Sequence, residues 1–357
     1  MKKLFCLFLS ILFIAAACAP QVQEPDAESG ATPEVAEELN ADEAADFISE
    51  QITLGAGTEW AVDGMLTLPA DGEKFPAVVL VHGSGAHDMD ETIFENKPFR
   101  DIAEYLSSNG IAVLRYDMRT FTHGERIVTE LGGSLTVWEE KVEDAIFAAE
   151  LLRADARIDS DRIFMLGHSM GGMLAPQIHA EGGDFAGLIL FAGSPRFLLD
   201  ISKDQNIDYI EEMFEGAEKA VMLAQMQTWD DQIAALMELS DEEARETVFD
   251  PNAGLYVYYL KDMYFKPAAD FIADTSIPFL VMHAENDVQV SLEKDFELYK
   301  ELLAGRDNVT FKLYEGLNHL FMTGEKAGIM ELLEQYAIPG KVDSQVLADI
   351  AEWIHAN

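Results

Sequence analysis

The sequence predicts an α/β protein: a doubly wound, mostly parallel β-sheet with a helical cap inserted near the middle of the chain. From about Gln51 onward, short and fully apolar runs alternate with segments of helical periodicity. Strands that are apolar throughout belong to parallel sheets with helices on both faces. One long stretch, at about residues 196–273, interrupts this alternation with helical periodicity alone, which places the cap there.

The strands are expected in the following order. Gly-rich turns flank the first two, which should pair antiparallel, and the later ones should be parallel and buried. The expected strands are Gln51–Leu54, Ala61–Leu68, Pro76–Val81, Ile111–Tyr116, Arg162–Leu166, Gly187–Phe191, Pro278–His283 and Val309–Tyr314.

Helices are expected between these strands, where apolar residues recur every three or four positions. The first is followed by Asn-Gly, a common signal for the end of a helix. The expected helices are Phe99–Ser108, Val137–Leu152, one starting at Met170, Leu292–Leu303 and Val346–His355.

The predicted cap at about 196–273 contains no convincing buried strand. It carries a helical apolar stripe from Met222 to Met237 and an aromatic cluster from Tyr256 to Tyr264. We expect it to lie over one edge of the sheet, with most of these side chains packed on the main domain and a few lining a pocket. It has no run long enough to form the broad apolar face of an interfacial lipase lid.

Composition excludes several classes of function. The 357 residues include 24 Lys and Arg against 65 Asp and Glu, a net charge of −41, which repels nucleic acid and anionic lipid surfaces. Both cysteines, Cys6 and Cys18, precede the folded body, so cysteine catalysis and thiolate metal sites are excluded there. No cofactor, metal cluster or protein partner is predicted.

Residues 1–17 are typical of a secretory signal peptide, with Lys2 and Lys3 before a short apolar run and small residues at its end. The run is shorter than the roughly 20 residues of a membrane-spanning helix. The Ala-Ala-Ala-Cys ending resembles the bacterial lipoprotein signal, although Ala15 stands where Leu is more usual. Cys18 is therefore the predicted lipidation site, and ordinary signal cleavage is the alternative.

Residues 18–46 are acidic and punctuated by prolines, which predicts an extended tether. The folded domain then comprises residues 47–357. The expected location is outside the cytoplasm, as a membrane-anchored lipoprotein of the bacterial cell envelope.

The sharpest motif is Gly-His-Ser-Met-Gly, from Gly167 to Gly171. The motif alone is short enough to arise by chance, but here it follows an apolar strand and opens a helix, as a nucleophile elbow requires. In such a tight turn, side chains at the flanking positions would clash, which explains the glycines. Ser169 is therefore the predicted nucleophile.

A serine nucleophile needs donors for the oxyanion. The His-Gly-Ser-Gly run after the Pro76–Val81 strand can bring a backbone N–H opposite the elbow, and its glycines allow close approach. The N–H groups of Ser84 and Met170 are the predicted donor pair. The alternative is a simple turn at the end of a strand.

The base and the acid should follow the serine in the order Ser, Asp, His. His319 follows the last strand and is the predicted base, because the other histidines are worse placed. Asp287, after the Pro278–His283 strand, is the predicted acid. Glu285 is its main rival, and Asp200 is a more remote one.

With these motifs in place, the chain from about residue 51 to its end resembles the α/β-hydrolase superfamily. More narrowly, it is similar to a bacterial esterase branch close to serine-aminopeptidase-like and dienelactone-hydrolase-like proteins. His87 and Met89 depart from the residues usual in that branch. The segments that carry the resemblance are His82–Asp90, Pro98–Asp101, Leu114–Thr120, the Asp-Asn-Val-Thr-Phe-Lys run at 307–312 and the Gly-Leu-Asn-His-Leu-Phe run at 316–321.

The resemblance implies Ser169, Asp287 and His319 as a catalytic triad, with Ser84 and Met170 as the oxyanion hole. The sequence therefore predicts a cofactor-independent serine hydrolase that cleaves short-chain carboxylic esters through an acyl-enzyme. An aminopeptidase or amidase of the same fold, and a non-catalytic binding lipoprotein, are the alternatives.

Overall fold

The computed structural model describes residues 46–357. The expected signal peptide, Cys18 and nearly all of the expected tether therefore lie outside the described residues. Within residues 46–357, no helix combines the length and the apolar character needed to cross a membrane.

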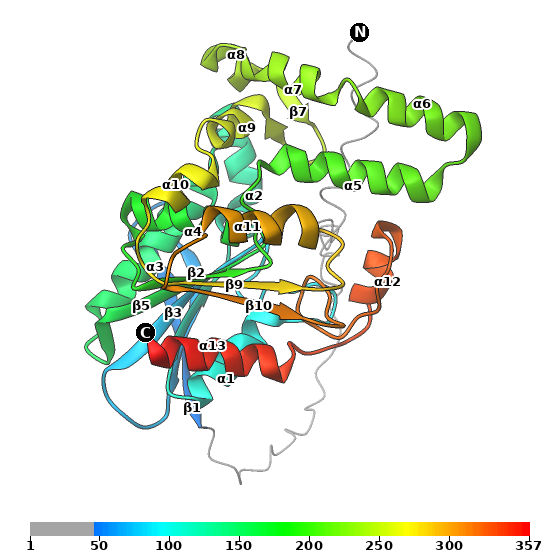
Figure 1. The fold of residues 1–357 in the computed structure, drawn as a ribbon. Coiled ribbons are helices and arrows are strands. Elements are labelled where there is room, and N and C mark those ends of the chain that lie inside the picture. The colour runs from blue at the N-terminus through cyan, green and yellow to red at the C-terminus, as the bar shows by residue number, and fades with distance from the viewer. Residues whose placement is uncertain (1–45) are drawn as a thin grey trace, which may run out of the picture.

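An eight-stranded sheet forms the centre of the described domain (Figure 1), in the order β1-β2-β4-β3-β5-β6-β9-β10. β1 pairs antiparallel with β2, and β2 pairs antiparallel with β4, whereas the other neighbours are parallel. The predicted fold class is confirmed. The strands are β1 (Phe47–Leu54), β2 (Val62–Pro69), β3 (Phe75–Val81), β4 (Ala112–Tyr116), β5 (Ile158–His168), β6 (Gly187–Phe191), β9 (Phe279–Ala284) and β10 (Val309–Tyr314).

Helices cover both faces of the sheet, as its apolar strands require. On one face lie α1 (Pro98–Ser108) and α13 (Ser344–Ala356), and on the other lie α3 (Glu143–Ala154), α4 (Met170–Ile178) and α11 (Glu297–Leu302). Two further helices, α2 (Arg119–Glu130) and α12 (Leu332–Tyr336), have no counterpart in the sequence prediction.

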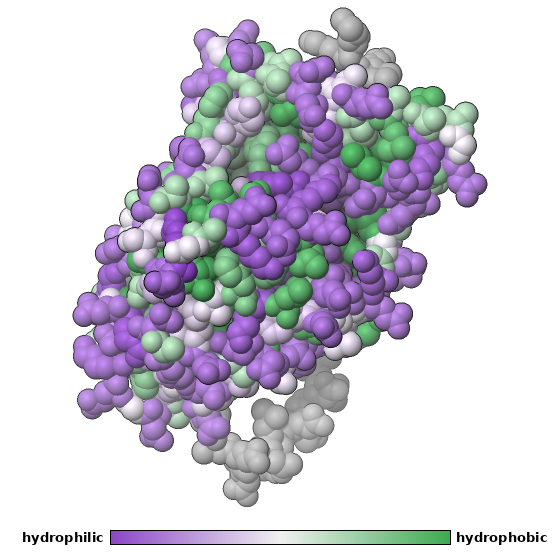
Figure 2. Space-filling view, viewed as in Figure 1, coloured by the Kyte–Doolittle hydropathy of each residue, from purple (hydrophilic) through white to green (hydrophobic). Residues whose placement is uncertain are grey.

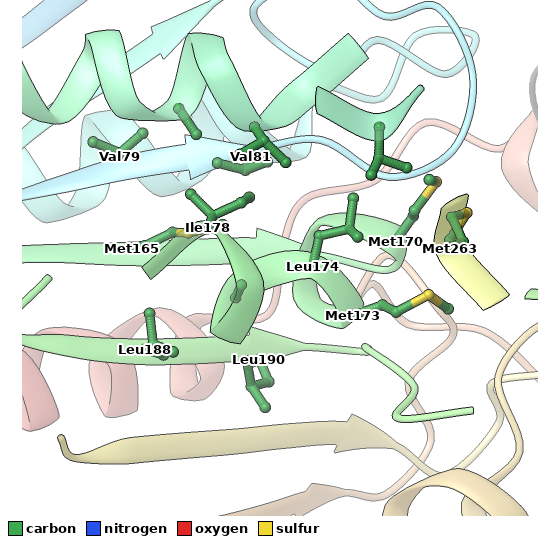
Figure 3. Close-up of a cluster of buried hydrophobic side chains, with 14 of the residues drawn as sticks. Val79, Val81, Met165, Met170, Met173, Leu174, Ile178, Leu188, Leu190 and Met263 are labelled. Carbon is green, nitrogen blue, oxygen red and sulfur yellow. The ribbon is translucent and has the colours of Figure 1, made fainter. Parts of the chain in front are cut away.

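Alternate residues of the central strands supply the two halves of the core. In β3, Val78 and Leu80 belong to the cluster beneath α1 and α13, whereas Val79 and Val81 belong to the cluster beneath α3 and α4. Figure 3 shows Val79 and Val81 in the same cluster as Leu174 of α4. Each fully buried aliphatic side chain contributes about 1.5–3 kcal/mol, so this double burial anchors the strands that carry the site.

The cap consists of α5 to α10 and a two-stranded sheet, β7–β8 (Figure 1). The expectation that the cap contains no buried strand is wrong, because β7 buries Phe249. Strands of two and three residues are too short to leave a periodic signal in the sequence. The cap elements are α5 (Leu198–Met213), α6 (Gly216–Met226), α7 (Trp229–Met237), α8 (Asp241–Glu246), β7 (Val248–Asp250), β8 (Leu255–Tyr256), α9 (Val257–Tyr264) and α10 (Ala268–Asp274).

The position of the cap also differs from the prediction. It does not lie over an edge of the sheet, because its helix α5 lines the same cavity as Ser169. Ser169 directly follows the central strand β5. Met263 of α9 joins the same apolar cluster as Met170 and Met173 at the start of α4 (Figure 3). The cap therefore covers the carboxyl ends of the central strands.

Candidate active site

Ser169 occupies a strained turn between β5 and α4. Its φ of 51° and ψ of −115° lie outside the usual regions for a residue with a side chain. Its backbone is held on both sides, since its N–H donates to the Phe191 carbonyl (2.8 Å) and its carbonyl accepts from the Met173 N–H (3.0 Å). The turn thus presents the hydroxyl beyond the end of the sheet.

Two glycines make this turn sterically possible. A Cβ at position 167 would lie 2.2 Å from the Gly171 carbonyl oxygen, and a Cβ at position 171 would lie 2.2 Å from the Val81 carbonyl oxygen. Both contacts are with backbone, which cannot move aside as a flexible side chain can. The requirement for glycine at these positions is therefore local and steric.

Asp287 and His319 form a hydrogen bond of 2.6 Å between Oδ2 and Nδ1. The other carboxylate oxygen of Asp287 accepts the N–H groups of Gln289 (2.8 Å) and Val290 (3.0 Å). Burial alone would raise the pKa of Asp287, but the charge and hydrogen bond of His319 outweigh it and lower that pKa. Asp287 is thus held ionised beside the His319 ring.

The rival carboxylates lie elsewhere. Glu285 accepts the Gly316 N–H through Oε2 (3.3 Å), and Asp200 is exposed on α5. Of these three carboxylates, Asp287 is the one that bonds to His319.

The predicted oxyanion donors flank the serine. Ser84, Met170, Ser169 and His319 line one cavity of about 60 Å³. The Ser84 hydroxyl also donates to Met170 Sδ at 3.5 Å, which brings the two residues into contact. From the cap, Leu198, Ile201 and Gln205 of α5 complete the wall.

The loop that carries Ser84 is held by buried side chains. Nε2 of His87, which departs from the related branch, donates to the Ser84 carbonyl (2.8 Å). Glu91 accepts the Gly83 N–H (2.7 Å), and its second oxygen accepts from His168 Nδ1 (2.9 Å). This loop is therefore fixed against the turn that carries Ser169.

The comparison with protein families matches residues 78–328, well over half of the 357-residue chain, to the alpha/beta hydrolase family. This protein is an alpha/beta hydrolase. The resemblance inferred from the sequence motifs is thus confirmed.

Individual relatives agree with this assignment. This hydrolase is 37% identical over 292 residues to Esterase EstD of Thermotoga maritima; the match covers 82% of this chain and 65% of the relative. Among solved structures, Est1E from Butyrivibrio proteoclasticus is similar at a TM-score of 0.50 and 16% identity, over 85% of this chain and 99% of the other. A Pyrobaculum calidifontis esterase is similar at a TM-score of 0.50 and 20% identity, over 87% of this chain and 85% of the other. These two structures establish the fold.

Sequence reasoning missed two buried charged residues beside the site of this hydrolase. Glu91 lies in a run of acidic residues, and Lys141 follows two glutamates, so both resemble solvent-exposed charges. Their exposed fractions are 1% and 3%. Only the packing of distant segments identifies them. Among the described residues, no group of His, Cys, Asp and Glu could hold a metal ion.

Proposed function

We propose that this protein is a serine carboxylesterase that cleaves small esters through an acyl-enzyme intermediate, without a cofactor. Ser169 is the nucleophile and His319 the general base and acid. Asp287 orients His319, and the N–H groups of Ser84 and Met170 form the oxyanion hole.

In the first half-reaction, Ser169 Oγ attacks the acyl carbon while His319 Nε2 takes the hydroxyl proton. The two N–H groups donate to the oxyanion of the tetrahedral intermediate. Collapse expels the alcohol, which takes the proton from His319. In the second half, His319 activates a water molecule that attacks the acyl-enzyme, and the acid leaves as the Ser169 hydroxyl is restored.

The observation that carries this proposal is the buried Asp287–His319 hydrogen bond of 2.6 Å, in a cavity shared with a serine at a strained turn. A serine hydroxyl is a weak nucleophile without an adjacent base, and a histidine oriented by a carboxylate supplies one. The similarity to a protein named Esterase EstD supports an ester as the substrate.

The size of the cavity favours short acyl chains. Its volume is about 60 Å³, smaller than an engineered apolar cavity of about 150 Å³ that binds benzene. We expect turnover to be fastest with acetate or butyrate esters and slowest with laurate esters, and no surge in rate on emulsified triglyceride.

Ser169→Ala tests the nucleophile. Turnover of p-nitrophenyl butyrate should fall by about 10⁴-fold or more while the thermal unfolding midpoint stays near that of the parent protein. A fluorophosphonate probe should label the parent protein and not the variant. Equal labelling of both would reject Ser169 as the nucleophile, and a parent protein that is not labelled would favour a non-catalytic binding lipoprotein.

An aminopeptidase or amidase is the second candidate, and one observation favours it. A cavity of about 400 Å³ shares Ile201, Gln205 and Gln289 with the smaller one, and six carboxylates line it against two cationic side chains. Such a lining suits a substrate amine. Assaying aminoacyl p-nitroanilides beside the simple esters decides between the two, because faster cleavage of the anilides would replace the esterase assignment.

The proposal also includes a lipid anchor on Cys18 that holds the enzyme at a membrane of the bacterial cell envelope. It is supported by the lipoprotein-like ending of residues 1–17 and the acidic stretch that follows. Cys18→Ser should move the protein from the membrane fraction to the soluble extracytoplasmic fraction, or block its processing. Unchanged partition and absence of acyl incorporation in the parent protein would refute this anchor.

A further inference from the structure

Lys141 is a buried cation that the mechanism above does not use. It lies in the π-helical turn Trp138–Val142 that precedes α3, and only 3% of its surface is exposed. Turns of this kind are rare and often occur at functional sites. A buried ammonium is costly unless it is paired and hydrogen-bonded, so its partners matter.

The main partner of Lys141 is a backbone carbonyl in the oxyanion loop. Nζ donates to the Gly83 oxygen at 2.7 Å, and Glu140 Oε1 lies 3.5 Å from Nζ. Glu140 is itself tied to the cap, because the Tyr259 hydroxyl donates to its other oxygen. The ammonium therefore has both a counter-charge and a fixed acceptor.

The Gly83 carbonyl belongs to the same peptide unit as the Ser84 N–H. A trans peptide is planar, and its N–H points to the side opposite its C=O. A hydrogen bond that fixes the carbonyl therefore fixes the direction of the N–H. Donation from a cation also polarises the peptide unit, which makes its N–H a stronger donor.

The other side of Gly83 is fixed as well. Its own N–H donates to Glu91 Oε1 at 2.7 Å, and a Cβ at this position would lie 3.1 Å from Ser169 Cβ. Glu91 thus holds the peptide before Gly83 and Lys141 the peptide after it, which contains the Ser84 N–H, so that two buried charges fix Gly83 directly beside the nucleophile.

We infer that Lys141 is a positioning residue for the oxyanion hole: through the Gly83 carbonyl it orients and polarises the Ser84 N–H toward the developing oxyanion. This inference rests on the oxyanion role proposed for Ser84. It does not depend on the substrate being an ester, because any acyl or phosphonyl transfer to Ser169 develops charge on the same oxygen.

The test uses three substitutions at Lys141 and one matched control. Lys141→Met removes the charge and the donor, Lys141→Gln keeps a neutral donor, and Lys141→Arg keeps a charged one. Tyr259→Phe is the control, since it removes the hydroxyl that bonds to Glu140 and lies 4.0 Å from Met170 Sδ, and leaves Lys141 on Gly83. Thermal unfolding of all variants identifies effects that come from stability alone.

The first readout is the rate of Ser169 labelling by a fluorophosphonate. Complete loss of an oxyanion donor costs about 10²–10³ in rate, so loss of its positioning should cost about 10–100-fold in Lys141→Met. Lys141→Arg should recover much of that loss, Lys141→Gln should be intermediate, and Tyr259→Phe should stay within about 3-fold of the parent. If Lys141→Met does not fold, the order of Gln, Arg and parent carries the test.

The second readout is the kinetics of ester hydrolysis. Lys141→Met should lower kcat and leave KM nearly unchanged, because the oxyanion exists in the transition state and not in the bound ester. Its affinity for a trifluoromethyl ketone, which forms an oxyanion on Ser169, should fall in parallel with kcat/KM, whereas its affinity for the matching methyl ketone should not.

Labelling of folded Lys141 variants at the parent rate would overturn the inference. A change confined to KM, or a loss of labelling rate equal to that of Tyr259→Phe, would overturn it as well. Failure of the proposed esterase function would look different. The parent protein would then hydrolyse no ester, while the order of labelling rates among the variants would still report on Lys141.

Discussion

At the scale of single residues, the ionised groups around Ser169 are buried in pairs. Asp287 bonds to His319, Glu91 bonds to His168, and both carboxylates keep a lowered pKa although burial alone would raise it. An unpaired charge at such depth costs several kcal/mol, so each pair is a condition for folding as well as a feature of the site.

Asp287 should matter to the rate far more than its neighbour in sequence. Asp287→Asn should lower kcat by about 10⁴-fold, because an amide can no longer hold His319 in the required tautomer. Glu285→Gln is the matched control, since Glu285 bonds to the Gly316 N–H and should leave kcat within a few-fold of the parent. Steady-state kinetics measure both, and a larger loss in Glu285→Gln would reassign the acid.

The Glu91–His168 pair should make stability depend on pH. His168 donates from Nδ1 to Glu91 and from Nε2 to the His319 carbonyl (3.1 Å), and two acceptors require both ring nitrogens to be protonated. Burial alone lowers the pKa of His168, but Glu91 raises it above 6.5, and the pKa of Glu91 falls to about 2 from 4.5.

The directions of these two pKa shifts determine the pH range in which the Glu91–His168 pair stabilises the fold. The contribution of His168 to the free energy of unfolding is fully present below pH 6.5 and is lost as the pH rises through its folded pKa. The contribution of Glu91 is present above pH 4.5 and is lost as the pH falls toward 2. The stability gap between the parent protein and the Glu91→Gln/His168→Gln double variant should therefore be widest near pH 5–6 and narrow toward pH 9. Denaturant unfolding across this range measures it, and a gap independent of pH would contradict the assignment.

At the scale of elements, the turn between β5 and α4 should tolerate no side chain at Gly171. Gly171→Ala places a Cβ 2.2 Å from the Val81 carbonyl oxygen, so β3 and α4 must separate. We expect a loss of about 1–3 kcal/mol in the free energy of unfolding and a marked loss of activity, as for other overpacked cores.

Gly124→Ala is the control for that substitution. Gly124 lies within α2, and a Cβ there would meet no atom within 4 Å. Because alanine favours a helix over glycine, this variant should gain about 0.4–1 kcal/mol and keep full activity. Equal destabilisation of the two variants in denaturant would show that the clash at Gly171 is not decisive.

The same elements show how far the sequence predicts the structure. Apolar runs located every strand of the main sheet, but β5 begins at Ile158 rather than Arg162, because residues 159–162 are polar and the pairing with β3 is irregular there. The helix predicted to begin at Val137 starts instead with a π-helical turn, which buries Lys141. Local periodicity reports which residues are apolar, whereas burial of a charge depends on partners far along the chain.

At the scale of the whole molecule, the sequence carries a net charge of −41, and hydrophilic residues cover most of the described face in Figure 2. Part of this charge reaches the site. The larger cavity is lined by carboxylates, including Asp208 on α5, and the pKa of Asp208 is raised by burial and by neighbouring carboxylates. Their mutual repulsion makes this cavity unfavourable for a further negative charge.

The carboxylates of this cavity should make the rate of hydrolysis depend on the charge of the substrate. An ester with a free carboxylate, such as a p-nitrophenyl hemisuccinate, should show kcat/KM about 10-fold below that of a neutral ester of similar size at low ionic strength. One repulsive contact of about 1–1.4 kcal/mol suffices for this difference. The gap should shrink to about 3-fold at 1 M NaCl, where the screening length is about 3 Å, and Asp208→Asn/Glu293→Gln should narrow it at low salt.

An ester that carries a quaternary ammonium group completes the comparison. It should react at least as fast as the neutral ester at low ionic strength, and salt should slow it, because the same carboxylates that repel a hemisuccinate attract a cation. The control pair Asp208→Asn and Asp270→Asn separates the cavity from the overall charge: both remove one negative charge, but Asp270 lies on α10, outside the lining of this cavity. If the two variants change the ratio of the rates for the cationic and the anionic ester equally, the net charge of the molecule and not the cavity sets the preference for substrate charge.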